Sequence, residues 1–114
     1  MKALLLALAL VAAALPALAE AWIEALDLPL AQGLSTGADD VTEFDSGAGR
    51  IVVVAAQGPV AAADVRRYYL DALPALGWQS RGEGRFVRAG ERLDIDIVRS
   101  GGQTAVTFRL APLD

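Results

Sequence analysis

Two alternating stretches near the C-terminus constrain the fold of this chain more than any other part of its sequence. In residues 91–99 (ERLDIDIVR) and 103–110 (QTAVTFRL), apolar side chains recur at every second position. Because successive side chains of a β-strand point to opposite faces, this pattern predicts two strands with one buried and one solvated face. Gly101 and Gly102 between them are typical of a tight hairpin turn. A register shift of one residue would place Phe108 in water, so the pairing is strongly specified.

Residues 61–76 show the period of an amphipathic helix. Pro74 lacks an amide hydrogen and crowds the carbonyl of Leu70, which predicts a kink or a short 3₁₀ turn. Gly77 is expected to end the helix in the left-handed conformation, with Trp78 folding back on the last turn. One apolar stripe runs along the helix, and we expect it to pack on the sheet. Its members are Val65, Tyr68, Tyr69, Ala72, Leu73 and Leu76.

Further strands are expected on either side of this helix. Residues 41–44 and 50–57 flank a glycine-rich turn and predict a hairpin. The second stretch has four β-branched residues in succession and no alternation, so we expect a central strand covered on both faces. Residues 79–81 and 85–88 predict either a tight hairpin or one bulged strand. The order β-β-α-β-β-β over residues 41–114 predicts an α+β fold, a two-layer sandwich with one helix on a twisted antiparallel sheet.

The first 19 residues, MKALLLALALVAAALPALA, have the tripartite pattern of a secretory signal peptide. Lys2 supplies a positive charge, residues 4–15 form an unbroken apolar run, and small residues precede a cleavage point after Ala19. The run is shorter than the roughly 20 residues that a membrane-spanning helix needs. We therefore predict export to the periplasm or secretion, with no stable membrane span after cleavage. The alternative, a buried helix of a cytoplasmic domain, would require a polar face that these residues lack.

Residues 20–40 form an N-terminal arm ahead of the predicted domain. Trp22, Ile23 and Leu26 are spaced for one helical turn, and the proline and glycines that follow stop anything longer. The arm either lies across the domain or is disordered after cleavage. Docking is favoured, because the segment is too apolar for a free tail. In a docked arm, the apolar side chains that pack against the domain would be those of Leu28, Leu30 and Leu34.

Histidine and cysteine are both absent from the sequence. Their absence excludes histidine-dependent triads, thiol redox chemistry and the usual zinc sites. An exported domain without disulfides is held together by packing alone. Asp94 and Asp96 are a carboxylate pair, but they lie on the same side of one strand, about 7 Å apart. Glycoside hydrolysis needs two acids facing each other across a cleft. We therefore interpret the pair as a solvated strand face and predict no catalytic residue and no cofactor.

Charged residues give little sign of a metal or a nucleic acid. The acidic cluster Asp39, Asp40, Glu43 and Asp45 offers oxygen ligands for calcium but lacks the spacing of an EF-hand loop. We predict no metal site there. The chain has 14 acidic and 10 basic residues, a net charge of −4, and its arginines are scattered. Phosphate binding needs a concentrated positive surface, so nucleic acid is not an expected partner.

Several segments together suggest a family. They are the leader and four further segments: DLPLAQGL, the FDSGAGRI hairpin, the VRRYYLDALPALGW helix and GRFVRAGERLDIDI. In these segments the chain resembles a group of small, uncharacterised exported proteins from Gram-negative bacteria. The resemblance covers nearly all of the chain after the leader and implies a signal peptide followed by one small α+β domain. No catalytic residue comes with it. The order of helix and strands is also similar to that of small envelope accessory domains, which bind other proteins.

Together these features predict a non-enzymatic periplasmic binding or accessory protein that contacts another envelope protein. The contact surface would be the arm, residues 22–34, or an exposed sheet edge. The alternative is a small-ligand carrier with a pocket between helix and sheet, and a carboxylate-dependent hydrolase is a third class. A pocket of about 300 Å³ or more under the helix, reached by Tyr68 or Trp78, would favour the carrier. A filled core there, with an apolar exposed arm, would favour a protein partner. The candidate binding residues are Trp22, Tyr68, Tyr69 and Trp78.

Overall fold

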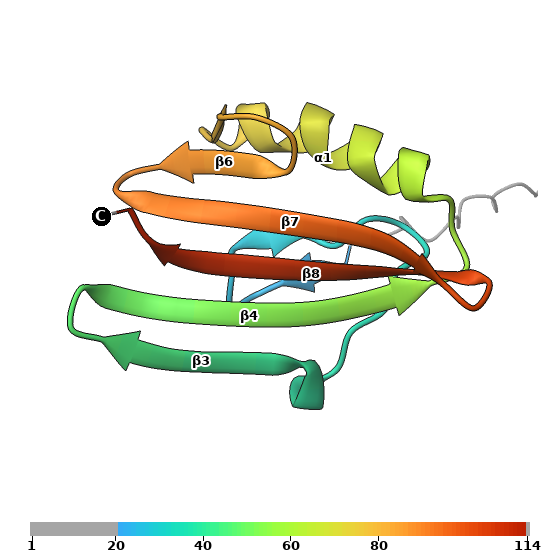
Figure 1. Ribbon diagram of the computed structural model, residues 1–114, viewed down its shortest axis with the longest axis horizontal. Coiled ribbons are helices and arrows are strands. Elements are labelled where there is room, and N and C mark those ends of the chain that lie inside the picture. The colour runs from blue at the N-terminus through green and yellow to red at the C-terminus, as the bar shows by residue number, and fades with distance from the viewer. Residues whose placement is uncertain (1–20, 114) are drawn as a thin grey trace, which may run out of the picture.

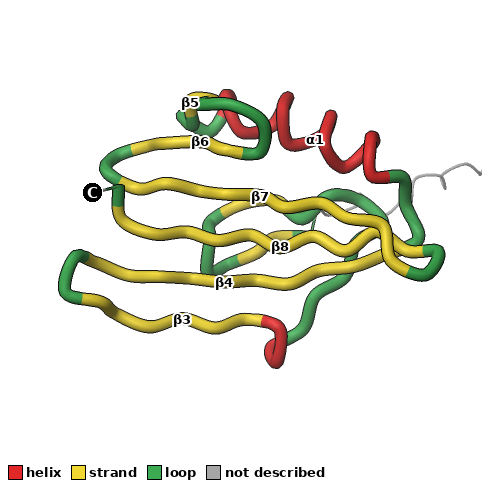
Figure 2. Tube along the Cα trace, in the orientation of Figure 1, coloured by secondary structure: helices red, strands yellow, loops and turns green. Residues whose placement is uncertain are grey.

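The computed structural model of the protein describes residues 21–113 (Figure 1), so the predicted signal peptide lies outside the described residues. The described chain forms one α-helix, one short 3₁₀ helix and eight strands, which Figure 2 distinguishes by colour. In chain order these are β1 (Trp22–Ile23), β2 (Leu28–Pro29), η1 (Ala38–Asp40), β3 (Val41–Ser46), β4 (Gly49–Gly58), α1 (Ala62–Ala75), β5 (Gln79–Ser80), β6 (Arg85–Arg88), β7 (Glu91–Ser100) and β8 (Gln103–Pro112).

The eight strands form two sheets. β1 and β2 pair with each other, and the other six form an antiparallel sheet in the order β3-β4-β8-β7-β6-β5. The predicted α+β class is confirmed, but the predicted order β-β-α-β-β-β is incomplete. It omits β1 and β2, and it counts residues 79–88 as one strand where the structure has the hairpin β5–β6. Gly82 and Gly84 make this hairpin possible, because their φ angles of 122° and 72° suit glycine best.

The β7–β8 hairpin has the turn and the faces that its alternation predicts. Gly101 and Gly102 have φ angles of 55° and 82°, as a two-residue turn with positive φ requires. Ile95 lies opposite Phe108, and both side chains are buried on one face of the sheet. Thr107 lies on the opposite face and is exposed. The register is therefore the one that keeps Phe108 out of water.

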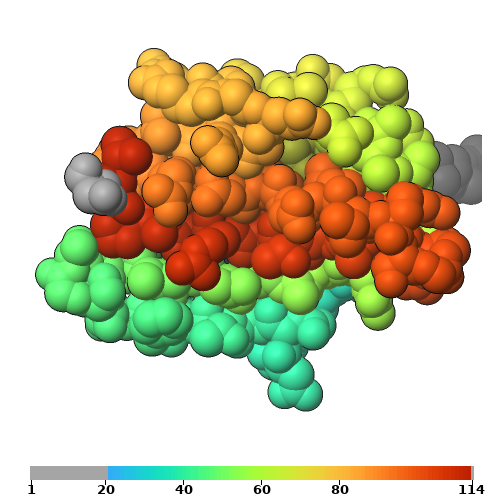
Figure 3. Space-filling view, in the orientation of Figure 1, coloured from blue at the N-terminus to red at the C-terminus, as the bar shows by residue number. Residues whose placement is uncertain are grey.

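β4 lies between β3 and β8, but only one of its faces is covered. Val52 and Val54 are fully buried, whereas Val53 is half-buried and Ala55 is exposed. The prediction of a strand covered on both faces is therefore wrong. β-Branched residues suit an extended backbone on either face, so a run of them need not mean two covering layers. Figure 3 views the uncovered face, where the side chains of β4, β8 and β7 lie at the surface.

The N-terminal arm packs on the covered face of the sheet. In Figure 1 the segment that carries β1 and β2 runs behind β8 and β4, and α1 packs beside it against β7 and β5. No α-helical turn forms around Trp22. Instead Asp27, with φ 56°, helps to turn the chain back, so that Trp22 lies opposite Pro29; aspartate tolerates this conformation better than most residues. The buried residues of the arm are Ile23, Leu26, Leu28, Pro29, Leu30, Ala31 and Leu34.

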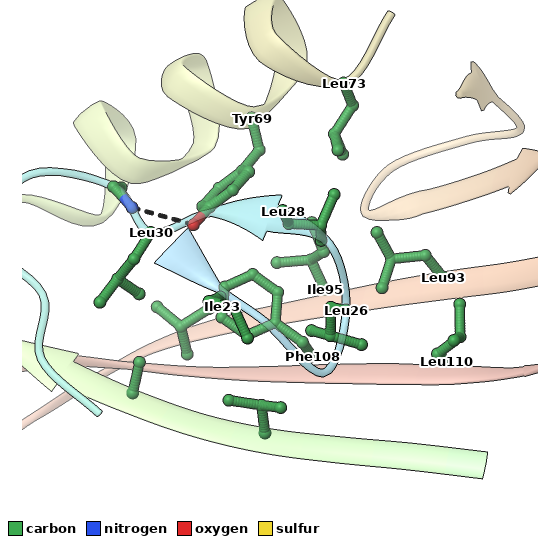
Figure 4. Close-up of a cluster of buried hydrophobic side chains, with 14 of the residues drawn as sticks. Ile23, Leu26, Leu28, Leu30, Tyr69, Leu73, Leu93, Ile95, Phe108 and Leu110 are labelled. Atoms are coloured by element: carbon green, nitrogen blue, oxygen red, sulfur yellow. Dashed lines mark hydrogen bonds between the residues drawn. The ribbon is translucent and has the colours of Figure 1, made fainter. Parts of the chain in front are cut away.

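One hydrophobic core joins the arm, α1 and the sheet (Figure 4). α1 contributes Val65, Tyr69 and Leu73, which lie on one side of the helix. The leucines of the arm pack beside these side chains in the same cluster, on the same face of the sheet. The arm and α1 therefore cover the same face of the sheet side by side, and Tyr69 of α1 reaches Phe108 of β8 directly.

Candidate functional site

Tyr69 is one of the four residues that the sequence suggested for binding, and it lies at the centre of the core with 2% of its surface exposed. Its hydroxyl donates a hydrogen bond to the carbonyl of Pro29 (2.8 Å) and accepts one from the amide of Ala31 (3.0 Å), as Figure 4 shows in part. Its ring meets Tyr68 and Phe108 edge to face, with centroids 5.0 and 5.3 Å apart. Tyr69 therefore ties helix, arm and sheet together.

Trp78 is equally buried, at the end of α1. Gly77 has φ 93°, the amide of Trp78 donates to the carbonyl of Leu73 (3.0 Å), and that of Gly77 donates to Pro74 (3.0 Å). These two bonds define a Schellman cap. The amide of Leu76 also donates a hydrogen bond to the carbonyl of Leu73 (2.9 Å). This bond spans three residues, so the last turn of the helix is a tighter 3₁₀ turn. The predicted ending at Gly77, with Trp78 folded back on the helix, is confirmed.

Arg88 covers the outside of this cap. Its guanidinium carbon lies 4.4 Å from the centre of the Trp78 ring, and Nη1 donates a hydrogen bond to the carbonyl of Leu76 (2.8 Å). A cation at the C-terminus of a helix is favoured by the helix dipole, and its stacking on an indole adds a cation–π contact. Sequence reasoning missed Arg88, because its role depends on β6 lying beside the end of α1.

Trp22 and Tyr68 come together outside the core. Trp22 is 45% exposed, and with the half-buried Tyr68 it borders an open groove of about 380 Å³ between the β1–β2 hairpin and α1. This groove lies on the surface of the helix and not beneath it. Tyr68, Tyr69 and Trp78 do not form a common cup, because Tyr69 and Trp78 fill separate parts of the interior. The remaining lining residues of the groove are Pro29, Asp71, Ala72, Ala75 and Leu76.

A smaller cleft of about 240 Å³ lies between α1 and the strands β6 and β7. Its floor is apolar and includes Phe86 and Ile95, and its rim carries Arg66, Glu83 and Asp96. The Arg66 guanidinium and the Glu83 carboxylate are 3.9 Å apart, so the rim charges largely offset one another. The volume is below the roughly 300 Å³ at which pockets for small molecules begin.

The acidic residues singled out in the sequence lie in two places, in η1 and β3 and on β7. Asp94 lies opposite Arg109 on the open face of the sheet, with Oδ2 3.3 Å from Nε of Arg92. Asp40 accepts a hydrogen bond from the amide of Gly37 (2.9 Å) at the start of η1. In the part of the chain that the structure describes, no three acidic side chains gather as a metal site would require.

The β3 edge is the most open feature of the sheet. Within residues 21–113, β3 pairs only with β4, so one side of its backbone faces solvent. Glu43 and Asp45 are exposed, and Phe44 is 50% exposed. The opposite edge is β5, which has two residues and lies beside α1. Sequence reasoning named a sheet edge as a possible surface but did not identify β3, because strand order cannot be read from the alternation of one strand.

Comparison of the chain with protein-family models, with curated proteins and with solved structures finds no match. Among the described residues, no helix combines the length and the apolar character needed to cross a membrane. The resemblance to small exported proteins therefore stays a prediction, and the function is argued from the geometry of the chain.

Proposed function

We propose that this protein is a non-enzymatic binding protein of the cell envelope, exported to the periplasm, which holds another envelope protein through the β3 edge. The signal-peptide pattern of the first 19 residues supports the location. The sequence has neither histidine nor cysteine, and among the described residues no three acidic side chains gather as a metal site would require, which supports a role without catalysis.

The single observation that carries this proposal is the contrast between a filled interior and an open edge. Tyr69 and Trp78, which a carrier would place around its ligand, are each 2% exposed. β3 instead offers backbone donors and acceptors to an incoming strand. Strand addition to such an edge is a common way for one protein to bind an extended segment of another.

The groove beside Trp22 and Tyr68 favours a second candidate, a carrier of a small apolar ligand. Its lining is mainly apolar, and the exposed Trp22 could stack on a ring. The groove is open along its length, however, and known pockets bury most of a bound small molecule. We therefore rank the carrier second.

A pull-down from an envelope fraction distinguishes the two candidates. We expect the tagged wild-type protein to retain a defined envelope protein, and the interaction to be reproduced with the purified partner. Glu43→Pro should abolish retention, because proline removes an amide from the β3 edge. Leu70→Ala serves as the matched control, since Leu70 is 49% exposed on α1, away from β3.

Failure would take a specific form. If the wild type retained nothing, while a thermal-shift screen found a small molecule whose stabilising effect disappeared in Trp22→Ala, the carrier would replace the binding protein as the better account.

A further inference from the structure

The hydrogen-bond pattern of β4 fixes which of its backbone groups face β3. Ser35 exchanges two backbone hydrogen bonds with Gln57, of 2.8 and 3.0 Å. Ser35 lies on the same side of β4 as β3, opposite to the side that pairs with β8. Backbone groups alternate in direction along an antiparallel strand. Those of Ile51 and Val53, an even number of residues from Gln57, therefore also point toward β3.

This alternation determines which residues of β3 are available to a partner. Thr42 lies opposite Val53 and Phe44 opposite Ile51, so Thr42 and Phe44 belong to the ladder with β4. The backbone N–H and C=O groups of Glu43 lie between them and point away from the sheet, as do those of Asp45. The positions whose backbone is free to pair thus carry the acidic side chains.

The charges of Glu43 and Asp45 are available as well. Arg50 lies opposite Asp45 in the register, but its Nε contacts the carboxylate of Glu91 at 3.2 Å. No ion pair of Glu43 or Asp45 occurs among the described residues. On the other face of β3, Phe44 is half exposed. The edge therefore presents acidic side chains on one face and an apolar side chain on the other.

We infer that the β3 edge takes up an extended segment of a partner protein in which basic side chains alternate with apolar ones. The inference rests on the proposed function and adds the chemistry of the partner. The basic residues of the segment lie beside Glu43 and Asp45, and its apolar residues lie beside Phe44 on the opposite face. Backbone hydrogen bonds supply affinity, and the alternation of side chains supplies specificity.

A second copy of the chain does not fit this edge. Two β3 strands paired through their open sides would bring Glu43 and Asp45 opposite acidic residues of the other copy. Like charges directly opposite each other destabilise a strand pair. The same acidic residues that attract a basic segment therefore oppose self-association through β3.

Titration of the isotope-labelled protein with three designed heptapeptides tests the inference by NMR. One peptide alternates lysine and valine, one alternates glutamate and valine, and the third carries the lysines and valines of the first in two blocks. We expect the alternating lysine peptide to shift the amide resonances of Val41–Ser46 and to bind roughly tenfold more tightly than the glutamate peptide. High salt should weaken its binding, because exposed charges are screened.

Two variants separate the contribution of charge from that of the backbone. Glu43→Gln combined with Asp45→Asn should weaken binding of the lysine peptide about fivefold and retain strand addition. Glu43→Pro should abolish binding, because an outward-facing amide is lost. Leu70→Ala again serves as the control and should bind all three peptides as the wild type does.

The outcomes distinguish this inference from the proposed function. Equal binding of the lysine and glutamate peptides at β3 would overturn the preference for basic segments and leave the edge as a binding site. Binding of the block peptide as tightly as the alternating one, or a dimer formed through β3, would overturn it too. If no peptide shifted Val41–Ser46, strand addition of basic segments would be wrong, while the envelope pull-down would still decide whether the protein binds a partner.

Discussion

The sequence suggested two binding surfaces, the N-terminal arm and an exposed sheet edge, and in the structure the arm's apolar side chains are buried whereas the edge strand β3 is open. The leucines of the arm lie inside the molecule, where Leu28 has no exposed surface and Leu30 is 6% exposed. β3 lies at the end of the sheet, and Glu43, Phe44 and Asp45 on it are exposed. Both segments precede α1 in the sequence, yet one is part of the core and the other lies at its boundary.

This difference shows that the more apolar of two segments need not be the one that is available to a binding partner. The arm is the more apolar segment, and for that reason it is buried, because its leucines cover the sheet face that α1 leaves open. β3 has too few apolar side chains on either face to be covered. The less apolar segment therefore keeps its backbone groups accessible. Substitutions of the buried arm residues should lower stability most, whereas substitutions of outward-facing positions on the edge should mainly change binding.

The largest effect is expected for Leu28→Ala. The side chain is fully buried in the core, so its truncation should lower the free energy of unfolding by about 2–5 kcal/mol. Urea denaturation followed by tryptophan fluorescence measures this change. Leu70→Ala is the control, because its side chain is 49% exposed and its loss should change stability by no more than about 0.5 kcal/mol. Equal effects of the two substitutions would show that the arm does not belong to the core.

The sequence predicted the parts of the fold that local patterns determine. Alternation gave the β7–β8 hairpin, and Pro74 and Gly77 gave the end of α1, because each depends on residues close together in the chain. The path of the arm depends on contacts such as Tyr69 with Pro29, which lie 40 residues apart. Such a contact has no local signature, so the sequence could favour docking of the arm without specifying its partner.

The same distinction between local patterns and long-range contacts applies to the candidate site. Burial of Tyr69 and Trp78 follows from the helical stripe and the glycine cap, which were visible in the sequence. The exposure of Glu43 and Asp45 follows from the position of β3 at the end of the strand order. That order is a property of the whole sheet. In the sequence the same residues were weighed as calcium ligands, and they lacked the spacing of an EF-hand loop.

An intermediate effect is expected for Tyr69→Phe, which removes only the hydroxyl that joins helix to arm. The carbonyl of Pro29 and the amide of Ala31 would lose their partner while buried, which lowers stability by about 1–3 kcal/mol. Amide hydrogen exchange should become faster at Ala31 than in the wild type. Exchange at Val54, in the middle of β4, should follow only the global change. Unchanged protection at Ala31 would show that the arm is held without the tyrosine.

The smallest effect is expected for Glu43→Pro, and it sharpens the comparison most. The amide of Glu43 points away from β4, so proline removes no ladder hydrogen bond, and stability should fall by less than about 1 kcal/mol. Thr42→Pro is the matched substitution one residue earlier, where the amide points toward β4. It should destabilise the protein by about 1 kcal/mol more than Glu43→Pro does, because it leaves a strand carbonyl without its donor.

Urea denaturation of the two proline variants in parallel measures this difference, and the strain that proline introduces into an extended strand is common to both. If Glu43→Pro were the more damaging of the two, the backbone of Glu43 would face β4. The acidic side chains and the free backbone groups would then lie at different positions, and the β3 edge could not combine strand addition with recognition of basic residues in the way proposed.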